Sequence, residues 1–212
     1  MEVSLKEQAP SRPGESGWQA RKSAATREQI LDAAIRCIVE LGYSNATTMK
    51  IAEEAGLSRG ATLHHFPSKM DIIRSAVDYL HDKRLRAFRR SIRSIPEDAD
   101  RVKLAVVSYW QHANHGIYVA FFELSVAART DSELRKVLRP AQLAFDEEWY
   151  QTACDLFPEW MVDREAFDLA LNLCRQLIEG MAIGSLTHAR EENHELLLDY
   201  LEDRIRELMP RA

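Results

Sequence analysis

The part of the chain that decides its fold is residues 47–60, which read TTMKIAEEAGLSRG. Thr47 or Thr48 can cap a short helix with an apolar inner face, and Gly56 is placed to end that helix. Ser58 can then cap a second short helix that continues to about His65. Two short helices joined this tightly are typical of a helix-turn-helix, whose second helix enters the major groove of DNA.

A longer helix is predicted on the N-terminal side of this stretch. Thr26 and Gln29 have the spacing of a capping box, apolar residues follow at helical intervals, and Gly42 is placed to end the helix. Residues 1–20 are rich in proline, glycine and serine without apolar periodicity, so we expect a flexible arm there. The three-helix DNA-binding domain is therefore predicted over residues 21–68.

On the C-terminal side every segment has helical rather than alternating periodicity. Ser68 and Asp71 form a second capping box, which starts a connecting helix over residues 69–95. Residues 96–212 are expected to form a helical bundle. Its helices are expected at residues 99–115, 117–129, 140–156, 163–187 and 192–208, with a short helix capped by Thr130 and Glu133 before the third. We therefore predict an all-α protein.

Composition and charge narrow the class further. The chain has 212 residues, 46% of them hydrophobic, and a net charge of −5, which fits a folded globular protein. It has no apolar run of 18 residues, no signal sequence, and three cysteines without a C-x-x-C pair, so we expect a cytoplasmic protein. Residues 18–93 hold 14 Lys and Arg against 8 Asp and Glu, whereas residues 94–212 hold 12 against 22. Only residues 18–93 therefore carry the excess of positive charge that suits binding to a polyanion.

The sequence of the motif is continued by His65-Phe66-Pro67-Ser68-Lys69. Over residues 26–74 the chain closely resembles the DNA-binding domain of the tetracycline-repressor (TetR) family. The resemblance implies a homodimer with three DNA-binding helices and a variable ligand-binding and dimerisation domain. It implies a repressor that binds a palindromic operator and releases it when a small effector binds. One departure is Leu63, where the family commonly has a tyrosine that touches phosphate.

The residues predicted to contact DNA combine hydroxyl, guanidinium, imidazole and ammonium groups. They are Arg27, Thr48, Ser58, Arg59, Thr62, His64, His65 and Lys69. By the same resemblance, Phe66 is expected in the core and Thr47 as a cap.

A cavity for a small hydrophobic or aromatic effector is expected in the helical bundle of residues 96–212. Its candidate lining residues are Trp110, Tyr118, Phe122, Glu123, Trp149, Cys174 and Met181, with Tyr109 and Phe145 as further aromatic candidates. For Glu123 two interpretations stand: an ion pair with Arg129 or Arg175 inside the bundle, or a position facing the cavity.

The last two long helices are expected to form the dimer interface. The candidate residues are Leu177, Gly180, Gly184, Leu197 and Leu201. Small residues four apart allow a second helix to approach closely, although a neighbouring helix of the same chain would also explain them.

The sequence also contains weaker signals of other classes of protein. Glu191 and His194 have the E-x-x-H spacing of di-iron bundles, but no second such pair exists, so an all-α bundle enzyme or metal-binding protein is the distant alternative. The basic run over residues 83–90 is expected to be a solvated face rather than a membrane-binding one. We expect no cofactor and no metal.

Overall fold

The computed structural model describes residues 15–187 and 193–209, and within them it is all-α, as predicted. The helices are α1 (Glu15–Leu41), α2 (Thr48–Glu54), α3 (Arg59–His65), α4 (Lys69–Arg93), α5 (Arg101–Ala113), α6 (Gly116–Ala127), α7 (Ser132–Leu156), α8 (Arg164–Ser185) and α9 (His194–Leu208), with a short 3-10 helix at Pro158–Val162. None of them is long and apolar enough to cross a membrane.

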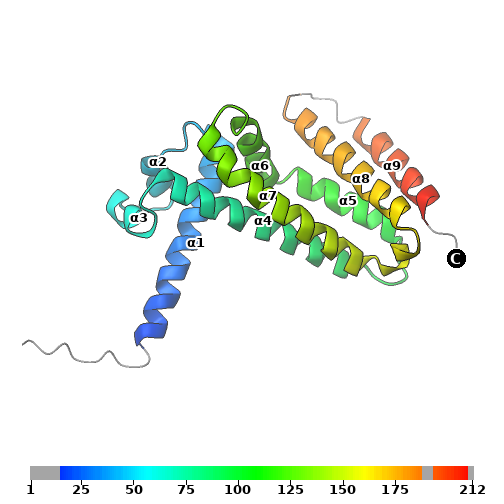
Figure 1. Cartoon of the computed structure of the whole chain (residues 1–212), viewed down its shortest axis with the longest axis horizontal. Helices are drawn as coiled ribbons and strands as arrows, with labels where there is room; N and C mark the ends of the chain where they lie inside the picture. The colour runs from blue at the N-terminus through cyan, green and yellow to red at the C-terminus, as the bar shows by residue number, and fades with distance from the viewer. Residues whose placement is uncertain (1–14, 188–192, 210–212) are drawn as a thin grey trace, which may run out of the picture.

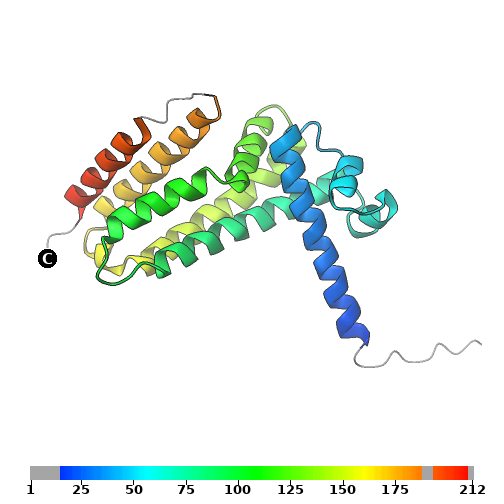
Figure 2. The same ribbon diagram turned by 180° about the vertical axis from the view of Figure 1, so that it is seen from behind.

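The helices form an elongated molecule with two unlike ends (Figure 1). Helices α2 and α3 lie at one end, and α8 and α9 lie at the other. Helix α4 runs from the first end into the bundle, where it packs against α5, α6 and α7. Helix α1 packs against both α4 and α6, and its N-terminal half projects away from the rest of the molecule (Figure 2). One continuous apolar core, from Ile30 in α1 to Leu201 in α9, joins the two ends.

Helix α1 begins much earlier than predicted. It starts at Glu15, so residues 15–20, expected in the arm, are helical, and residues 1–14 lie outside the described chain. Thr26 is inside the helix, where its hydroxyl donates to the carbonyl of Lys22 at 3.0 Å, and it does not form a capping box. The reason is that residues 18–25 contain good helix formers and no glycine or proline, so nothing stops the helix from extending.

Helix α7 is one helix, where the sequence predicted two. Its N-cap is Asp131, whose carboxylate accepts from the amides of Glu133 and Leu134 at 3.0 Å each, so the expected cap by Thr130 and Glu133 is wrong. Pro140 lies inside the helix. A proline there costs about 3 kcal/mol, but α7 packs along α4, and this packing outweighs the local preference.

The predicted helix ends at the two glycines are confirmed. Gly42 follows α1 with φ +77° and Gly56 follows α2 with φ +64°, both in the left-handed region that favours glycine. A Cβ on Gly42 would also lie 3.0 Å from a carboxylate oxygen of Glu123 in α6. This glycine therefore permits a close contact between the DNA-binding end and the bundle.

Candidate DNA-binding site

The two short helices are set at an angle by local caps. Thr47 Oγ1 accepts from the amide of Lys50 at 3.3 Å, which confirms Thr47 as the cap of α2. Ser58 Oγ accepts from the amide of Ala61 at 3.1 Å and caps α3. The chain turns between them at Gly56, so α3 follows α2 after a very short connection. This is the geometry of a helix-turn-helix.

One face of α3 is presented to solvent. Ser58, Arg59 and His64 are exposed, and Leu63 and His65 are partly buried. Thr62 is fully buried, and its hydroxyl donates to the carbonyl of Ser58 at 3.2 Å. The prediction that Thr62 touches DNA is therefore wrong, because the packing of α3 turns this side chain inward.

Arg27 of α1 fastens the end of α3. Its Nη1 donates to the carbonyl of His65 at 2.9 Å, and its guanidinium lies 4.1 Å from the ring centre of Phe66. Phe66 itself is 2% exposed and belongs to the core, as predicted. Arg27 remains exposed, so its charge still contributes to the positive surface around α3.

Lys69 at the start of α4 has an internal partner. Its Nζ donates to the carbonyl of Tyr43 at 2.7 Å and lies 4.3 Å from the centre of the Tyr43 ring. Burial lowers the pKa of Lys69 from its ordinary value. Thr48, in the first turn of α2, is partly buried. Thr48 belongs to the helix-turn-helix itself, whereas Lys69 lies just after it and also holds the loop after α1.

Two further exposed elements lie at this end of the molecule. The projecting half of α1 carries Trp18 and Lys22, whose ammonium lies 5.2 Å from the indole ring, and both are exposed. Lys50 is exposed on α2. The uninterrupted run of helix formers before Thr26 was the signal that could have revealed the first of these.

The exposed, donor-bearing second helix of a short helix pair defines a helix-turn-helix DNA-binding protein. The comparisons agree. Residues 30–76 match the model of bacterial regulatory proteins of the tetR family. An HTH-type transcriptional regulator of Mycobacterium tuberculosis is 26% identical over 170 residues, which cover 78% of this chain and 85% of that protein. The regulator BetI of Pectobacterium carotovorum is 25% identical over 183 residues, which cover 84% of this chain and 93% of BetI.

Solved structures share the whole fold. A TetR-family regulator from Marinobacter aquaeolei superposes with a TM-score of 0.61 at 15% identity, covering 88% of this chain and 97% of that one. A candidate transcriptional regulator from Saccharomonospora viridis, in complex with choline, superposes with a TM-score of 0.67 at 23% identity, covering 89% and 100%.

The chain belongs to the TetR family of helix-turn-helix transcriptional regulators. This family and these relatives are regulators and not enzymes. In the described part of the chain, no three His, Cys, Asp or Glu side chains gather as metal ligands; Glu191 lies outside that part.

Tyr43 joins the DNA-binding end to the bundle. Its amide donates to Glu123 Oε1 at 2.8 Å, and its hydroxyl donates to Asp131 Oδ2 at 2.9 Å. Burial and the hydrogen bond to Asp131 raise the pKa of Tyr43 to about 12. Glu123 thus binds the backbone after α1. It pairs with neither Arg129 nor Arg175 and does not line the cavity described next, so both earlier interpretations of Glu123 are wrong.

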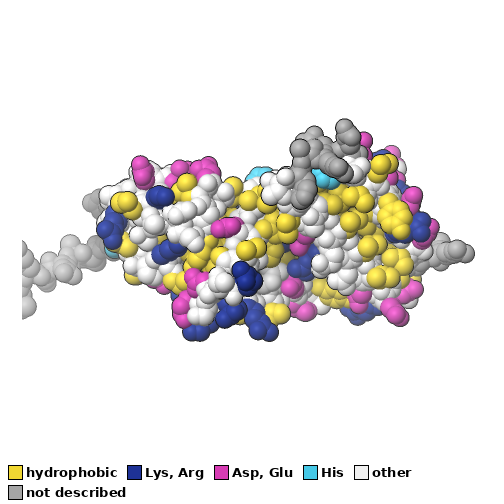
Figure 3. Space-filling view, turned by 90° about the horizontal axis from the view of Figure 1, so that it is seen from above, with side chains coloured by type: hydrophobic (Ala, Val, Ile, Leu, Met, Phe, Trp, Pro, Cys, Tyr) yellow, Lys and Arg dark blue, Asp and Glu magenta, His cyan; other side chains and the backbone are white. Residues whose placement is uncertain are grey.

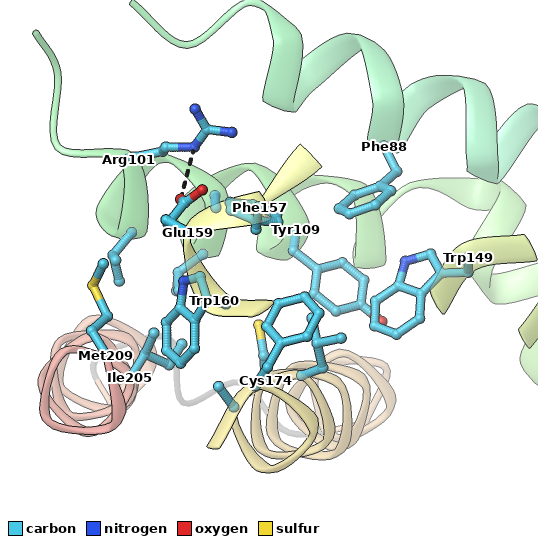
Figure 4. A pocket seen from close by; sticks show the side chains of 16 residues that line it. Phe88, Arg101, Tyr109, Trp149, Phe157, Glu159, Trp160, Cys174, Ile205 and Met209 are labelled. Atoms are coloured by element: carbon cyan, nitrogen blue, oxygen red, sulfur yellow. Dashed lines mark ion pairs between the residues drawn. The ribbon is translucent and has the colours of Figure 1, made fainter. Parts of the chain in front are cut away.

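The bundle holds an apolar cavity of about 130 Å³ between α4, α5, α7, α8 and α9 (Figure 4). Trp149 and Cys174 line it, as predicted, together with Tyr109. Phe88, Phe157, Trp160 and Phe167 are its other aromatic lining residues. The ion pair of Arg101 with Glu159, at 3.8 Å, lies at the edge of the cavity.

The other predicted lining residues lie elsewhere. Trp110 packs on His194 with ring centres 4.8 Å apart, and Tyr118 lies 4.3 Å under the guanidinium of Arg84. Phe122 and Met181 are buried in the core outside this cavity, and Phe145 stacks on His81. Periodicity marked these residues as internal, but which of them face one cavity depends on how the helices are rotated.

The predicted interface residues fall into two groups. Leu201 is fully buried in the core of its own chain, so its assignment to the dimer interface is wrong. Leu197 is 38% exposed, and Leu177 is partly buried. A Cβ built at Gly180 or Gly184 would meet no other described part of the chain within 4 Å. No described neighbouring helix of the same chain therefore explains the two glycines.

Proposed function

We propose that this regulator is a ligand-responsive repressor that binds a palindromic operator as a homodimer in the cytoplasm. The observation that carries the proposal is the exposed face of α3, where Ser58, Arg59 and His64 offer donors to base edges and phosphates. Thr48 and His65, both partly buried, flank this face, and Arg27 and Lys69 add positive charge beside it.

An apolar surface on α8 and α9 supports the homodimer. Large hydrophobic side chains there remain exposed in the single chain, and Figure 3 shows hydrophobic side chains gathered at that end of the molecule. They are Leu169, Ile183, Leu186, Leu196, Leu197 and Tyr200. An exposed patch of this kind is typical of an interface, and the open positions of Gly180 and Gly184 would let a partner helix approach closely.

The aromatic cavity supports a small effector of hydrophobic or aromatic character. Its volume of about 130 Å³ is close to that of apolar cavities that bind a single benzene ring in other proteins, roughly 150 Å³. Phe88 of the cavity lies on α4, the helix that begins beside the DNA-binding domain. A ligand that displaces this part of α4 would shift the separation of the two α3 helices and so favour the form that does not bind DNA.

The test is selection of DNA from a random duplex pool by the purified protein at near-physiological salt. We expect an enriched palindrome whose half-sites are about 10 base pairs apart, or a multiple of that, because each protomer presents one α3 helix. Sedimentation of the same sample should give the mass of a dimer. Failure to enrich any sequence would contradict sequence-specific binding, and enrichment of a single half-site by a monomer would contradict the homodimer.

A further inference from the structure

A second hollow lies apart from the aromatic cavity, between α4 and the junction of α5 with α6. Its volume is about 280 Å³, and five of its lining side chains are cationic or can become so: Lys83, Arg84, Arg90, His112 and His115. Among the described residues that line it, none is acidic. We call it the basic groove.

The basic groove is more than a solvated row of lysines and arginines. Arg84 on its inner wall is only 4% exposed, and its Nε has no hydrogen-bond partner among the described residues. Arg84 contacts one carboxylate, that of Glu179 at 3.4 Å, which lies outside the groove lining. A buried guanidinium with an unused donor makes binding of an anion favourable, because the anion would supply the hydrogen-bond acceptor that Arg84 Nε lacks.

His112 of the groove lies in the same positive field. Burial lowers the pKa of His112, and the nearby positive charges of His115 and Arg90 lower it further. His112 Nε2 is within 3.3 Å of the hydroxyl of Ser91, which also lines the groove. An anion among the cationic side chains of the groove would offset their mutual repulsion and would find N–H donors on more than one side.

The remaining walls are apolar. Ala87, Ile117 and Tyr118 line the groove beside the cations, so a ligand can place a hydrophobic group against them. From this arrangement we infer that the basic groove binds a small organic phosphate: a phosphate monoester carrying an apolar or aromatic group. Phosphate suits the site because its three free oxygens can accept from donors on several sides, whereas a carboxylate offers two in one plane.

The groove is connected to the DNA-binding end through Lys83. Lys83 Nζ lies 2.6 Å from a carboxylate oxygen of Asp32 in α1, so Asp32 already competes for one cation of the groove. A bound phosphate would draw on the same ammonium group. Ligand affinity and the contact between α4 and α1 are therefore coupled.

The probe is phenyl phosphate, titrated into the full chain by calorimetry in a phosphate-free buffer, without DNA. We expect binding that is weakened about tenfold or more by Arg90→Gln, since this change removes one charge-assisted hydrogen bond. Arg93→Gln is the matched control, because Arg93 is an exposed arginine of the same helix outside the groove lining. Arg59→Ala controls for phosphate bound at the DNA-binding face. Both controls should keep the wild-type affinity.

A complementary variant should act in the opposite direction. Asp32→Asn releases Lys83, so we expect phenyl phosphate to bind about threefold or more tightly, provided circular dichroism shows the native helix content. Absence of binding to the wild-type chain, an unchanged affinity in Arg90→Gln, or an equal loss in Arg93→Gln would overturn the phosphate site. An unchanged or weaker affinity in folded Asp32→Asn would overturn the role of Lys83. Because no DNA is present, none of these results depends on the proposed repressor function.

Discussion

The DNA-binding end and the bundle use arginine in opposite ways. Arg59 stands exposed at the start of α3, while Arg84 is buried among the rings of Tyr118, Phe121 and Phe145, each about 4.3 or 4.4 Å away. An exposed arginine contributes little to folding and is free to meet a partner. A buried arginine must be solvated by its own protein, so the fold depends on it. The two ends should therefore respond differently to loss of a guanidinium.

The largest effect is expected at Arg84. Arg84→Met fills similar space but removes the ion pair with Glu179 and the contacts with three rings, so we expect unfolding free energy to fall by about 3 kcal/mol. Arg86→Met is the control, because Arg86 pairs with Asp82 at the surface and should cost less than about 1 kcal/mol. Urea denaturation of both variants measures the difference. Similar losses in the two would show that burial of Arg84 is not what matters.

Acid should weaken the bundle through His81, which stacks on Phe145 beside Arg84. Burial lowers the pKa of His81 to about 3, and the positive charge of Arg84 adds to this effect. Between pH 6.5 and 3 the unfolded chain therefore binds a proton that the folded chain does not. Stability falls as pH drops through this range, by about 1.4 kcal/mol per unit, or about 2 kcal/mol between pH 6.5 and 5.

The control for this pH effect is His81→Gln, which has no group that titrates in this range. Its unfolding free energy should change less between pH 6.5 and 5 than that of the wild-type chain, whatever its absolute stability. Equal slopes for the two chains would exclude His81 as the source.

At the DNA-binding end the loss should appear in affinity. We expect Arg59→Ala to weaken operator binding by about 1–3 kcal/mol and to relax sequence preference, because Arg59 faces outward at the start of α3. Its unfolding free energy should stay within about 0.5 kcal/mol of wild type. Fluorescence anisotropy on operator and random duplexes measures the change in DNA affinity. Arg86→Ala is a distant exposed control. An equal loss on both duplexes would assign Arg59 to phosphate rather than to bases.

The comparison of the two ends also shows which structural features a single sequence can predict. The caps at Thr47, Ser58 and Ser68 and the turns at Gly42 and Gly56 depend on residues only a few positions apart, so a single sequence was enough to predict them. The start of α1 and the continuity of α7 were predicted incorrectly because a possible cap and a proline were given more weight than helix propensity and packing.

Contacts between distant residues could not be predicted in the same way. Thr62 lies on the same short helix as Arg59 and His64, but the packing of α3 turns it inward. Glu123 binds an amide 80 residues away, and only Trp149 and Cys174 of seven expected lining residues reach the aromatic cavity. A helical pattern identifies an inner face, but it does not determine the rotation of each helix against its neighbours.

The smallest expected effect tests the joint between the two ends. Tyr43→Phe removes only the hydroxyl that donates to Asp131, and it leaves the Tyr43 amide on Glu123 and the Lys69 contact with the Tyr43 carbonyl in place. We expect a loss of about 1 kcal/mol in unfolding free energy, since Asp131 still accepts from the first amides of α7. Tyr200→Phe, at a 59% exposed tyrosine, is the control and should change nothing measurable. If Tyr43→Phe leaves stability unchanged but alters operator affinity, the hydroxyl governs how the DNA-binding end is held against the bundle rather than whether the chain folds.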